Sequence, residues 1–270
     1  MYLIETIINL VIILLLVRLL INPREAHFNQ IFSLLFRITD PLLIPAKSLT
    51  RNDVRAILLS VLFLVLLRGL SYIFIKPIPF ISGVGSSFLS LFQLLFQFYM
   101  VVWFVSILTR HSYGSSFISM VQRAFLPLSA LSSRIGIPRQ HFSLFSFLSL
   151  LILYSLLSYI LHNIIGYGVI HSGFSFFHGL CEGSIFIIGL FPGFFSLVII
   201  VGALLSWVNP DPYNPVVETI YGISEPLLTP FRKLVPNFGG LDISPIIALL
   251  CFQFLGRFLQ KTIVGVMGII

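Results

Sequence analysis

Six long apolar runs constrain this chain more than any other feature of its sequence. Each is about as long as a helix must be to cross the hydrocarbon core of a bilayer, which takes roughly 20 residues. Charged residues make up only 9% of the chain, whereas soluble domains carry about 25%. The sequence therefore predicts an all-α membrane protein with six spanning helices, at residues 2–21, 54–75, 88–109, 142–165, 184–208 and 243–263.

The first and the fifth runs carry features that bear on how they cross the bilayer. The first has Glu5 where a secretory signal has a basic start, and it lacks a small-residue cleavage site. We therefore expect a retained spanning helix. The fifth contains Pro192 within "GLFPGFF", which predicts a kink because proline removes a helical hydrogen bond.

The positive charges are unevenly distributed among the loops. The net charge is +7, and most Lys and Arg residues fall in the first, third and fifth loops. Because cytoplasmic loops are enriched in these residues, the odd-numbered loops should face the cytoplasm and anionic lipids. This predicts a multi-pass protein of the bacterial inner membrane, with both termini on the opposite side. The cations are split among separate loops, which argues against nucleic-acid binding.

The three odd-numbered loops resemble one another. Each begins with a segment, too short to span, whose apolar residues follow helical spacing: residues 28–38, 117–126 and 216–223. Such segments are typical of interfacial helices. Each leads into a proline motif, "TDPLLIPAK", "LPLSALSSR" or "SEPLLTPFRK". The chain is thus predicted to form three helical hairpins, residues 1–76, 88–165 and 184–264, of which the middle one is degenerate.

The chemistry of the proline motif suggests a contact surface at the membrane. Because proline disfavours helix in the preceding residue, the interfacial helix should stop at Asp40 or Glu225, and a short turn should follow. The motif leucines could enter the acyl chains while the cations reach lipid phosphates. Asp53 and Asp242 are expected to cap the next helices. The candidate interaction residues are Asp40, Pro41, Pro45, Lys47, Glu225, Pro226, Pro230, Arg232, Lys233, Asp242 and Pro245.

An ion pathway is the main alternative function. Gln93 and Gln97 lie one turn apart in a predicted span, and intramembrane polar groups are candidates for function. Glutamines also bond neighbouring helices, however. Charged residues near helix ends are expected to snorkel to the interface; here these are Glu5, Arg18, Arg68 and Arg257.

A metal or haem site is a second alternative. His162, His171, His178, Cys181 and Glu182 cluster around the fourth loop, and histidine is a common ligand. Their spacing fits no defined metal motif, so we expect no metal and no cofactor. The sequence also lacks a phosphate loop, an HExxH motif and a zinc quartet, which favours a non-enzymatic protein.

The stretch from Ser206 to Pro245 resembles the YggT/YlmG family of small membrane proteins. The resemblance lies in the tryptophan-polar-proline stretch after a helix, the "SEPLLTPFR" core and the "GGLDISP" helix entry. Residues 193–260 form one such unit. Residues 5–75 form a weaker one, which keeps "ITDPLLIPAK" but lacks the GG and SP elements. The middle hairpin departs most from the pattern.

The resemblance implies an integral membrane protein without an established enzymatic activity. Bacterial relatives are linked to osmotic stress tolerance and to cell division or envelope organisation. Plastid relatives are linked to haem attachment and to nucleoid distribution. These links imply a membrane assembly or organising factor, whose partner is another membrane protein or a second copy of this chain.

Overall fold

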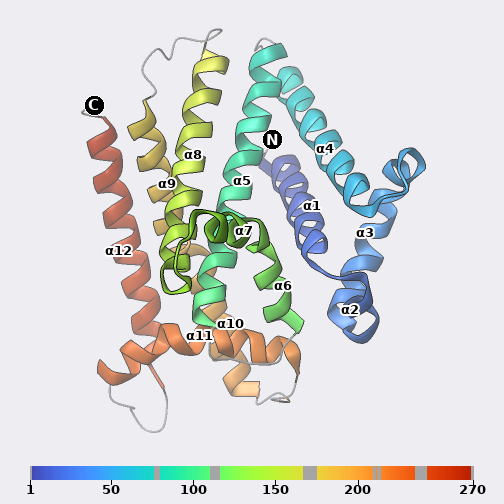
Figure 1. Cartoon of the computed structure of the whole chain (residues 1–270). Helices are drawn as coiled ribbons and strands as arrows, with labels where there is room; N and C mark the ends of the chain where they lie inside the picture. The colour runs from blue at the N-terminus through green and yellow to red at the C-terminus, as the bar shows by residue number, and fades with distance from the viewer. Residues whose placement is uncertain are drawn as a thin grey trace. The chain divides into compact units, whose positions relative to one another are not determined.

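The chain folds into helices in every regular segment that the structure describes (Figure 1). This computed structural model describes residues 2–75, 80–109, 116–166, 175–208, 211, 214–234 and 242–268. The helices are α1 (Tyr2–Leu20), α2 (Pro23–Phe28), α3 (Gln30–Leu49), α4 (Asp53–Ile75), α5 (Phe80–Leu108), α6 (Ser116–Ala124), α7 (Leu126–Ile135), α8 (Phe142–Gly166), α9 (Phe176–Gly189), α10 (Ser196–Val208), α11 (Pro215–Leu234) and α12 (Ser244–Met267). A 3-10 turn (Arg139–His141) precedes α8, and a π-helical turn (Phe191–Phe195) joins α9 to α10.

Six helical segments in the described residues are long and apolar enough to cross a membrane. They are Leu3–Leu20, Asp53–Tyr72, Ser82–Leu108, Arg139–Ile164, Phe176–Ser206 and Ser244–Met267. Each overlaps one of the six predicted spans, so the all-α membrane class and the number of spanning-length helices are confirmed. The division into three hairpins stays a prediction.

The helices group into two compact units. Unit 1 comprises Met1–Phe98 and Leu156–Phe176, and unit 2 comprises Tyr99–Ser155 and Phe177–Ile270. Each unit contains one helix with the double-proline motif, α3 in unit 1 and α11 in unit 2.

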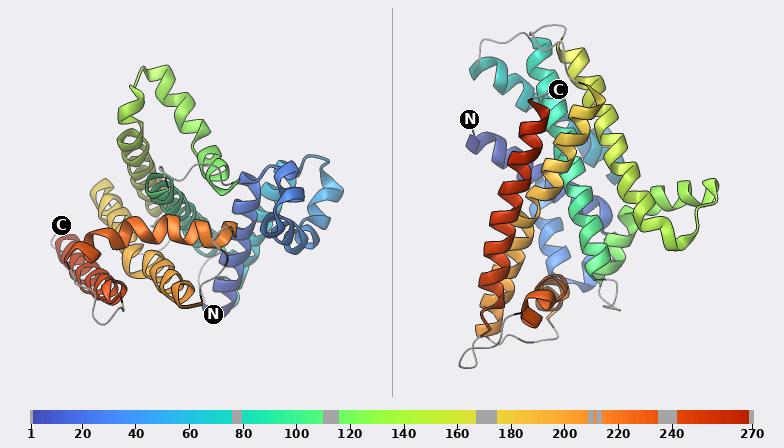
Figure 2. Two further views of the ribbon diagram at one scale, coloured as in Figure 1. Left: turned by 90° about the horizontal axis from the view of Figure 1, so that it is seen from below. Right: turned by 90° about the vertical axis from the view of Figure 1, so that its left-hand side faces the viewer.

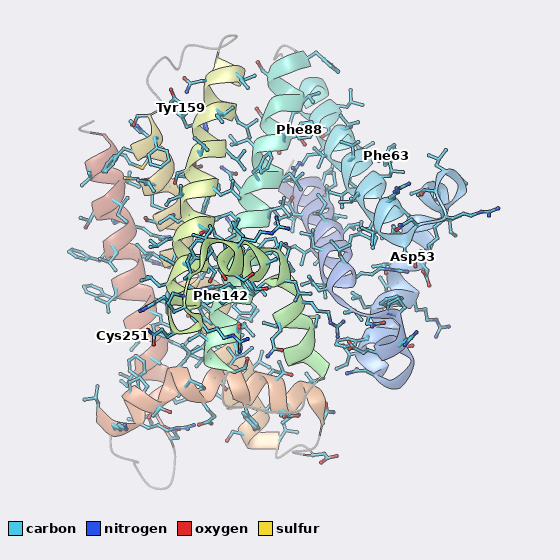
Figure 3. All side chains as sticks on the ribbon, viewed as in Figure 1. Asp53, Phe63, Phe88, Phe142, Tyr159 and Cys251 are labelled. Carbon is cyan, nitrogen blue, oxygen red and sulfur yellow. The ribbon has the colours of Figure 1, made fainter. Side chains whose placement is uncertain are left out.

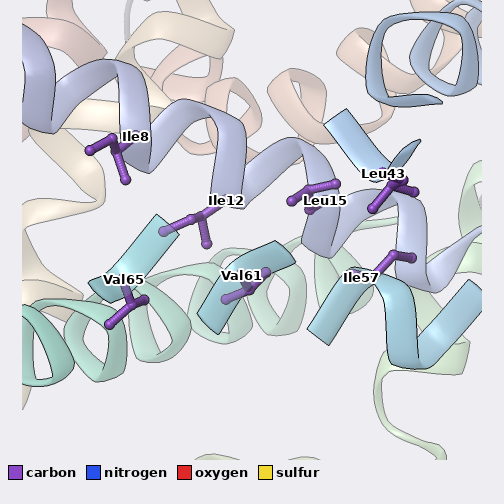
Figure 4. Packing of buried hydrophobic residues seen from close by; sticks show 7 residues of the cluster. All are labelled: Ile8, Ile12, Leu15, Leu43, Ile57, Val61 and Val65. Atoms are coloured by element: carbon purple, nitrogen blue, oxygen red, sulfur yellow. The ribbon is translucent and has the colours of Figure 1, made fainter. Parts of the chain in front are cut away.

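The core of unit 1 is a seam between α1 and α4, closed at one end by α3. Figure 4 shows Ile8, Ile12 and Leu15 of α1 facing α4, with Leu43 of α3 beside Leu15. The α4 residues that complete the cluster are Ile57, Val61 and Val65. Because the apolar residues repeat every three to four positions, each helix presents one face to the seam.

The core of unit 2 joins α10, α11 and α12. Ile199, Leu228 and Ala248 are buried together, one from each helix. In Figures 1 and 2, α11 runs crosswise to α12, as expected for a helix that lies along a membrane surface while its neighbour spans.

The π-helical turn interrupts the fifth spanning segment at Pro192, where the sequence predicts a kink. The N–H of Ser196 donates to the carbonyls of Phe191 and Gly193 in place of that of Pro192. The side-chain amide of Gln253 on α12 donates to that carbonyl instead, at 2.8 Å. This bond gives a backbone acceptor at the turn a side-chain donor from the neighbouring helix.

The expected proline turn is wrong for the first and third motifs. Helix α3 continues through Pro41 and Pro45, and α11 continues through Pro226 and Pro230. All four prolines lie on exposed positions, where polar solvent can reach the backbone carbonyls they leave unpaired. Burial of the opposite face of each helix then offsets the loss of two helical hydrogen bonds.

The middle motif does break the helix. Helix α6 ends at Ala124, and α7 begins at Leu126 with Pro127 in its first turn. A proline costs little there, because the first N–H groups of a helix have no intrahelical acceptor. The C-terminus of α7 closes at Gly136, whose φ of 78° lies in the left-handed region that favours glycine.

Candidate functional site

The motif helix of unit 1 presents its proline residues outward. Asp40, Pro41, Pro45 and Lys47 are all exposed on α3. The opposite face buries four residues against the rest of the unit, and these are Phe32, Thr39, Leu43 and Ala46. An exposed apolar stripe, formed by Ile31, Leu34, Ile38 and Leu42, runs along the helix beside the polar one. Helix α3 therefore has a packed, an apolar and a polar face, as expected at a membrane interface.

The motif helix of unit 2 has its buried and exposed positions in the same register. In each helix, the hydroxyl residue just before the motif acid is buried, and so is the leucine three residues after that acid. These buried residues are Thr39 and Leu43 in α3, and Ser224 and Leu228 in α11. The exposed motif residues of α11 are Glu225, Pro226, Pro230, Arg232 and Lys233.

In unit 1, one cation lies between two carboxylates. The Nζ atom of Lys47 is 3.5 Å from Oδ1 of Asp40 and 3.5 Å from Oδ1 of Asp53. Figure 3 shows Asp53 at the start of α4. Lys47 thus connects the motif helix to the beginning of the next spanning helix.

Unit 2 has the same arrangement with an arginine. The Nη1 and Nη2 atoms of Arg232 donate to the carboxylate of Glu225, and its Nε atom donates to Oδ2 of Asp242 at 2.8 Å. Oδ1 of Asp242 in turn accepts the N–H of Ser244 at the start of α12. The planar guanidinium can serve both acids at once, which a point charge does less well.

These bridges change the expected role of two motif cations. Lys47 and Arg232 were expected to reach lipid phosphates, but both are engaged by carboxylates of their own unit. Lys233 is exposed and makes no ion pair within the described part of the chain. It is therefore the motif cation best placed to meet an outside group.

Neighbouring cations keep the motif carboxylates ionised. Partial burial opposes the charged form of Asp40, but the hydrogen bond and charge of Arg18, together with Lys47, outweigh it and hold its pKa below 3.8. At Asp242, burial is likewise outweighed by bonds from Ser244 and Arg232, so its pKa is lowered. The bond from Glu225, followed by that from Asp242, raises the pKa of Arg232.

Arg18 is a site residue that sequence reasoning missed. Expected to snorkel, it is instead only 4% exposed. Its Nη1 atom donates to Oγ1 of Thr39 at 2.6 Å, and Nη2 donates to Oδ1 of Asp40 at 2.8 Å. The available signal was an arginine in the last turn of the spanning helix before the motif helix. In unit 2, the motif hydroxyl residue is Ser224, and it packs against Gly202 of α10. A Cβ atom on residue 202 would come within 2.9 Å of Oγ of Ser224.

Arg68 also differs from its expected role. This arginine is fully buried in unit 1 and does not snorkel. Its Nε atom donates to Oγ of Ser87 at 2.9 Å, and Nη1 donates to Oδ1 of Asn9 at 2.6 Å. One turn further along, the hydroxyl of Tyr72 donates to Glu5 at 2.9 Å. The Arg68 contacts and the Tyr72–Glu5 bond together join α1, α4 and α5 through polar side chains. The sequence gave no signal that Asn9 and Ser87 would take part.

Both predicted caps are displaced by one residue. At α12, the N-cap position is Ile243, which makes no side-chain cap bond. Asp242, one residue earlier, accepts the Ser244 N–H, and Pro245 occupies the first turn. At α4, the cap is Asn52, whose Oδ1 accepts the N–H of Val54 at 2.9 Å. Asp53, one residue later, is already helical and serves the Lys47 bridge.

The alternative sites are only partly described. His171 lies outside the described residues, and the described residues contain no group of three His, Cys, Asp or Glu side chains that could hold a metal ion. His162 bonds the Ser158 carbonyl one turn earlier in α8, at 2.9 Å. Gln93 and Gln97 are both partly buried on α5.

Comparison with known families gives a match that lies within unit 2. The family CCB3/YggT matches residues 182–263. The uncharacterized protein PA0392 of Pseudomonas aeruginosa is 41% identical over 103 residues, which cover 38% of this chain and 51% of that protein. An uncharacterized protein of Haemophilus influenzae is 38% identical over 68 residues, covering 25% of this chain and 37% of its own length.

The uncharacterized protein YggT of Escherichia coli K12 is 40% identical over 53 residues, covering 20% of this chain and 28% of that protein. The chain thus spans about half the length, or less, of the curated relatives it matches. No solved structure matches the chain. The matched segment contains Glu225, Arg232 and Asp242. The family match is therefore to residues 182–263, which resemble a CCB3/YggT unit.

Proposed function

We propose that this YggT-type membrane protein is a non-enzymatic assembly or organising factor of the bacterial inner membrane. One observation carries the proposal: the motif residues of α3 and α11 lie on the outer face of each helix, while other residues make the packed face. A surface used for contact requires this arrangement. The family resemblance points to envelope organisation or osmotic tolerance as the process.

The bridges of Lys47 and Arg232 serve to present this surface. Each fixes the motif helix to the start of the following spanning helix, so the exposed prolines keep a constant orientation. Pre-organisation of this kind reduces the entropy lost when a partner binds. The partner is another membrane protein or a second copy of the chain, with anionic lipids around it at the cytoplasmic face.

A test must separate the contact surface from the bridge that supports it. Lys233→Glu reverses an exposed charge without breaking an ion pair among the described residues. We expect it to abolish complementation of a deletion strain at high osmolarity while membrane level and thermal unfolding stay unchanged. Arg139→Glu reverses another exposed cation outside the motif and should complement fully.

Glu225→Gln tests the bridge itself. It removes the partner of Arg232, and we expect partial loss of complementation together with a small loss of stability. Full complementation by both Lys233→Glu and Glu225→Gln would contradict the proposal and leave the motif a purely architectural role.

A further inference from the structure

We propose that Arg257 and Lys261 on α12 form a binding site for the headgroup phosphate of one anionic phospholipid. This site is separate from the motif surface. It lies toward the Met267 end of the spanning helix, whereas the motif residues Arg232 and Asp242 lie beside its Ser244 end.

The orientation of α12 is set by one packed stripe. Ala248 is fully buried, and the amides of Gln253 and Gln260 donate to the carbonyls of Pro192 and Ile185 at 2.8 and 3.0 Å. Between the two glutamines, Gly256 lets α12 pack closely against Pro192, because a Cβ atom on residue 256 would come within 2.9 Å of the proline ring. With this stripe fixed, the remaining faces of α12 point outward.

Arg257 and Lys261 are both on those outward faces. They are exposed and lie one helical turn apart, so their side chains share one side of the helix. Neither makes an ion pair or a hydrogen bond with the rest of the described chain. The exposed neighbours Phe254, Phe258 and Val264 are apolar, which means that lipid is the surrounding medium.

The depth of the two cations explains why a phosphate is needed. At 1.5 Å per residue, Arg257 and Lys261 lie about 20 and 26 Å from the Ser244 end. The hydrocarbon core is about 30 Å thick, which places Lys261 near its far boundary and Arg257 one turn deeper. An extended Arg257 side chain reaches the level of Lys261. The two cations can therefore meet at one height and share a single phosphate, which relieves the cost of an unpaired charge in the hydrocarbon.

The test uses the full chain purified in mild detergent with defined lipids. Native mass spectrometry would count the phosphatidylglycerol molecules retained, with phosphatidylcholine as the zwitterionic comparison. We expect the wild type to retain phosphatidylglycerol in preference to phosphatidylcholine, and Arg257→Gln/Lys261→Gln to lose one bound phosphatidylglycerol. The charge-conserving Arg257→Lys should retain it.

Matched controls assign the loss to this site. Arg51→Gln/Arg55→Gln removes two exposed cations, one just before α4 and one in its first turn, and should leave the α12 lipid bound. Equal retention of phosphatidylglycerol by the wild type and the Arg257→Gln/Lys261→Gln variant would overturn the proposal. So would a wild type that shows no preference between the two lipids. Either result would favour an acidic helix of another protein as the occupant.

Discussion

Asp40 is the residue whose environment gives the clearest pH dependence. Arg18 and Lys47 hold its pKa below 3.8, so its charge contributes stability above that value. The contribution is lost as the pH falls through the lowered pKa. The melting temperature of the wild type should therefore exceed that of Asp40→Asn by a constant amount at neutral and mildly acidic pH, and the difference should shrink below pH 3.8. In an Arg18→Gln background the difference should be smaller and disappear at a higher pH. A pH-independent difference would contradict this account.

Arg68 should be the most costly single residue to remove in unit 1. Arg68→Leu removes the donor to the partly buried Asn9 and to the side chain and carbonyl of the buried Ser87. Leaving a buried acceptor without its donor costs about 1–3 kcal/mol. Helical circular dichroism during denaturant unfolding in micelles would measure the loss.

Arg55→Leu is the matched control for Arg68. It removes an exposed arginine from the same helix, and surface substitutions usually change stability by only about 0.5 kcal/mol. Similar small effects of the two variants would show that the Arg68 contacts contribute little.

At the scale of the element, the continuity of α3 through two prolines makes a sharp prediction. Proline is about 3 kcal/mol less favourable than alanine inside a helix. If α3 is a continuous helix, Pro41→Ala/Pro45→Ala should raise the melting temperature, because it restores two backbone donors. If the prolines made the turn expected from sequence, the same change should lower it, because proline stabilises turns.

Pro127→Ala provides the comparison within the same chain. Pro127 already occupies the first turn of α7, where a missing N–H costs little. Its replacement should leave the melting temperature nearly unchanged. A gain at Pro127 as large as at the α3 prolines would contradict the structural distinction between them.

The elements also show what sequence could and could not establish. The spanning helices were predictable because long apolar runs have few alternatives in a bilayer. The continuity of α3 was not predictable, because local proline chemistry predicts that the helix stops. Burial of one face favours a continuous helix instead, and the buried residues are Phe32, Thr39, Leu43 and Ala46. That burial depends on α1 and α4, which are distant in sequence. The pairing of Lys47 with Asp53 and the burial of Arg18 depend on the same packing.

At the scale of the whole molecule, the distribution of positive charge bears on the orientation of the chain in the membrane. Positive charge in the odd-numbered loops predicts a cytoplasmic location for them, but Arg257 and Lys261 add charge toward the opposite end of α12. If a lipid phosphate neutralises these two cations, they no longer oppose the positive-inside pattern. The orientation and the lipid proposal are therefore linked, although each has its own measurement.

Orientation can be measured by cysteine labelling in spheroplasts. With Cys181 and Cys251 replaced by alanine, single cysteines at the exposed positions Ser48, Ser133 and Thr229 report on the three odd-numbered loops. A membrane-impermeant maleimide should label them only after lysis, because these loops are predicted to be cytoplasmic. A cysteine at the exposed Gly268 should be labelled in intact spheroplasts and serves as the control for expression and reactivity. Labelling of Ser48→Cys or Thr229→Cys before lysis would place the motif helices on the outer side, where the proposed cytoplasmic contact surface could not operate.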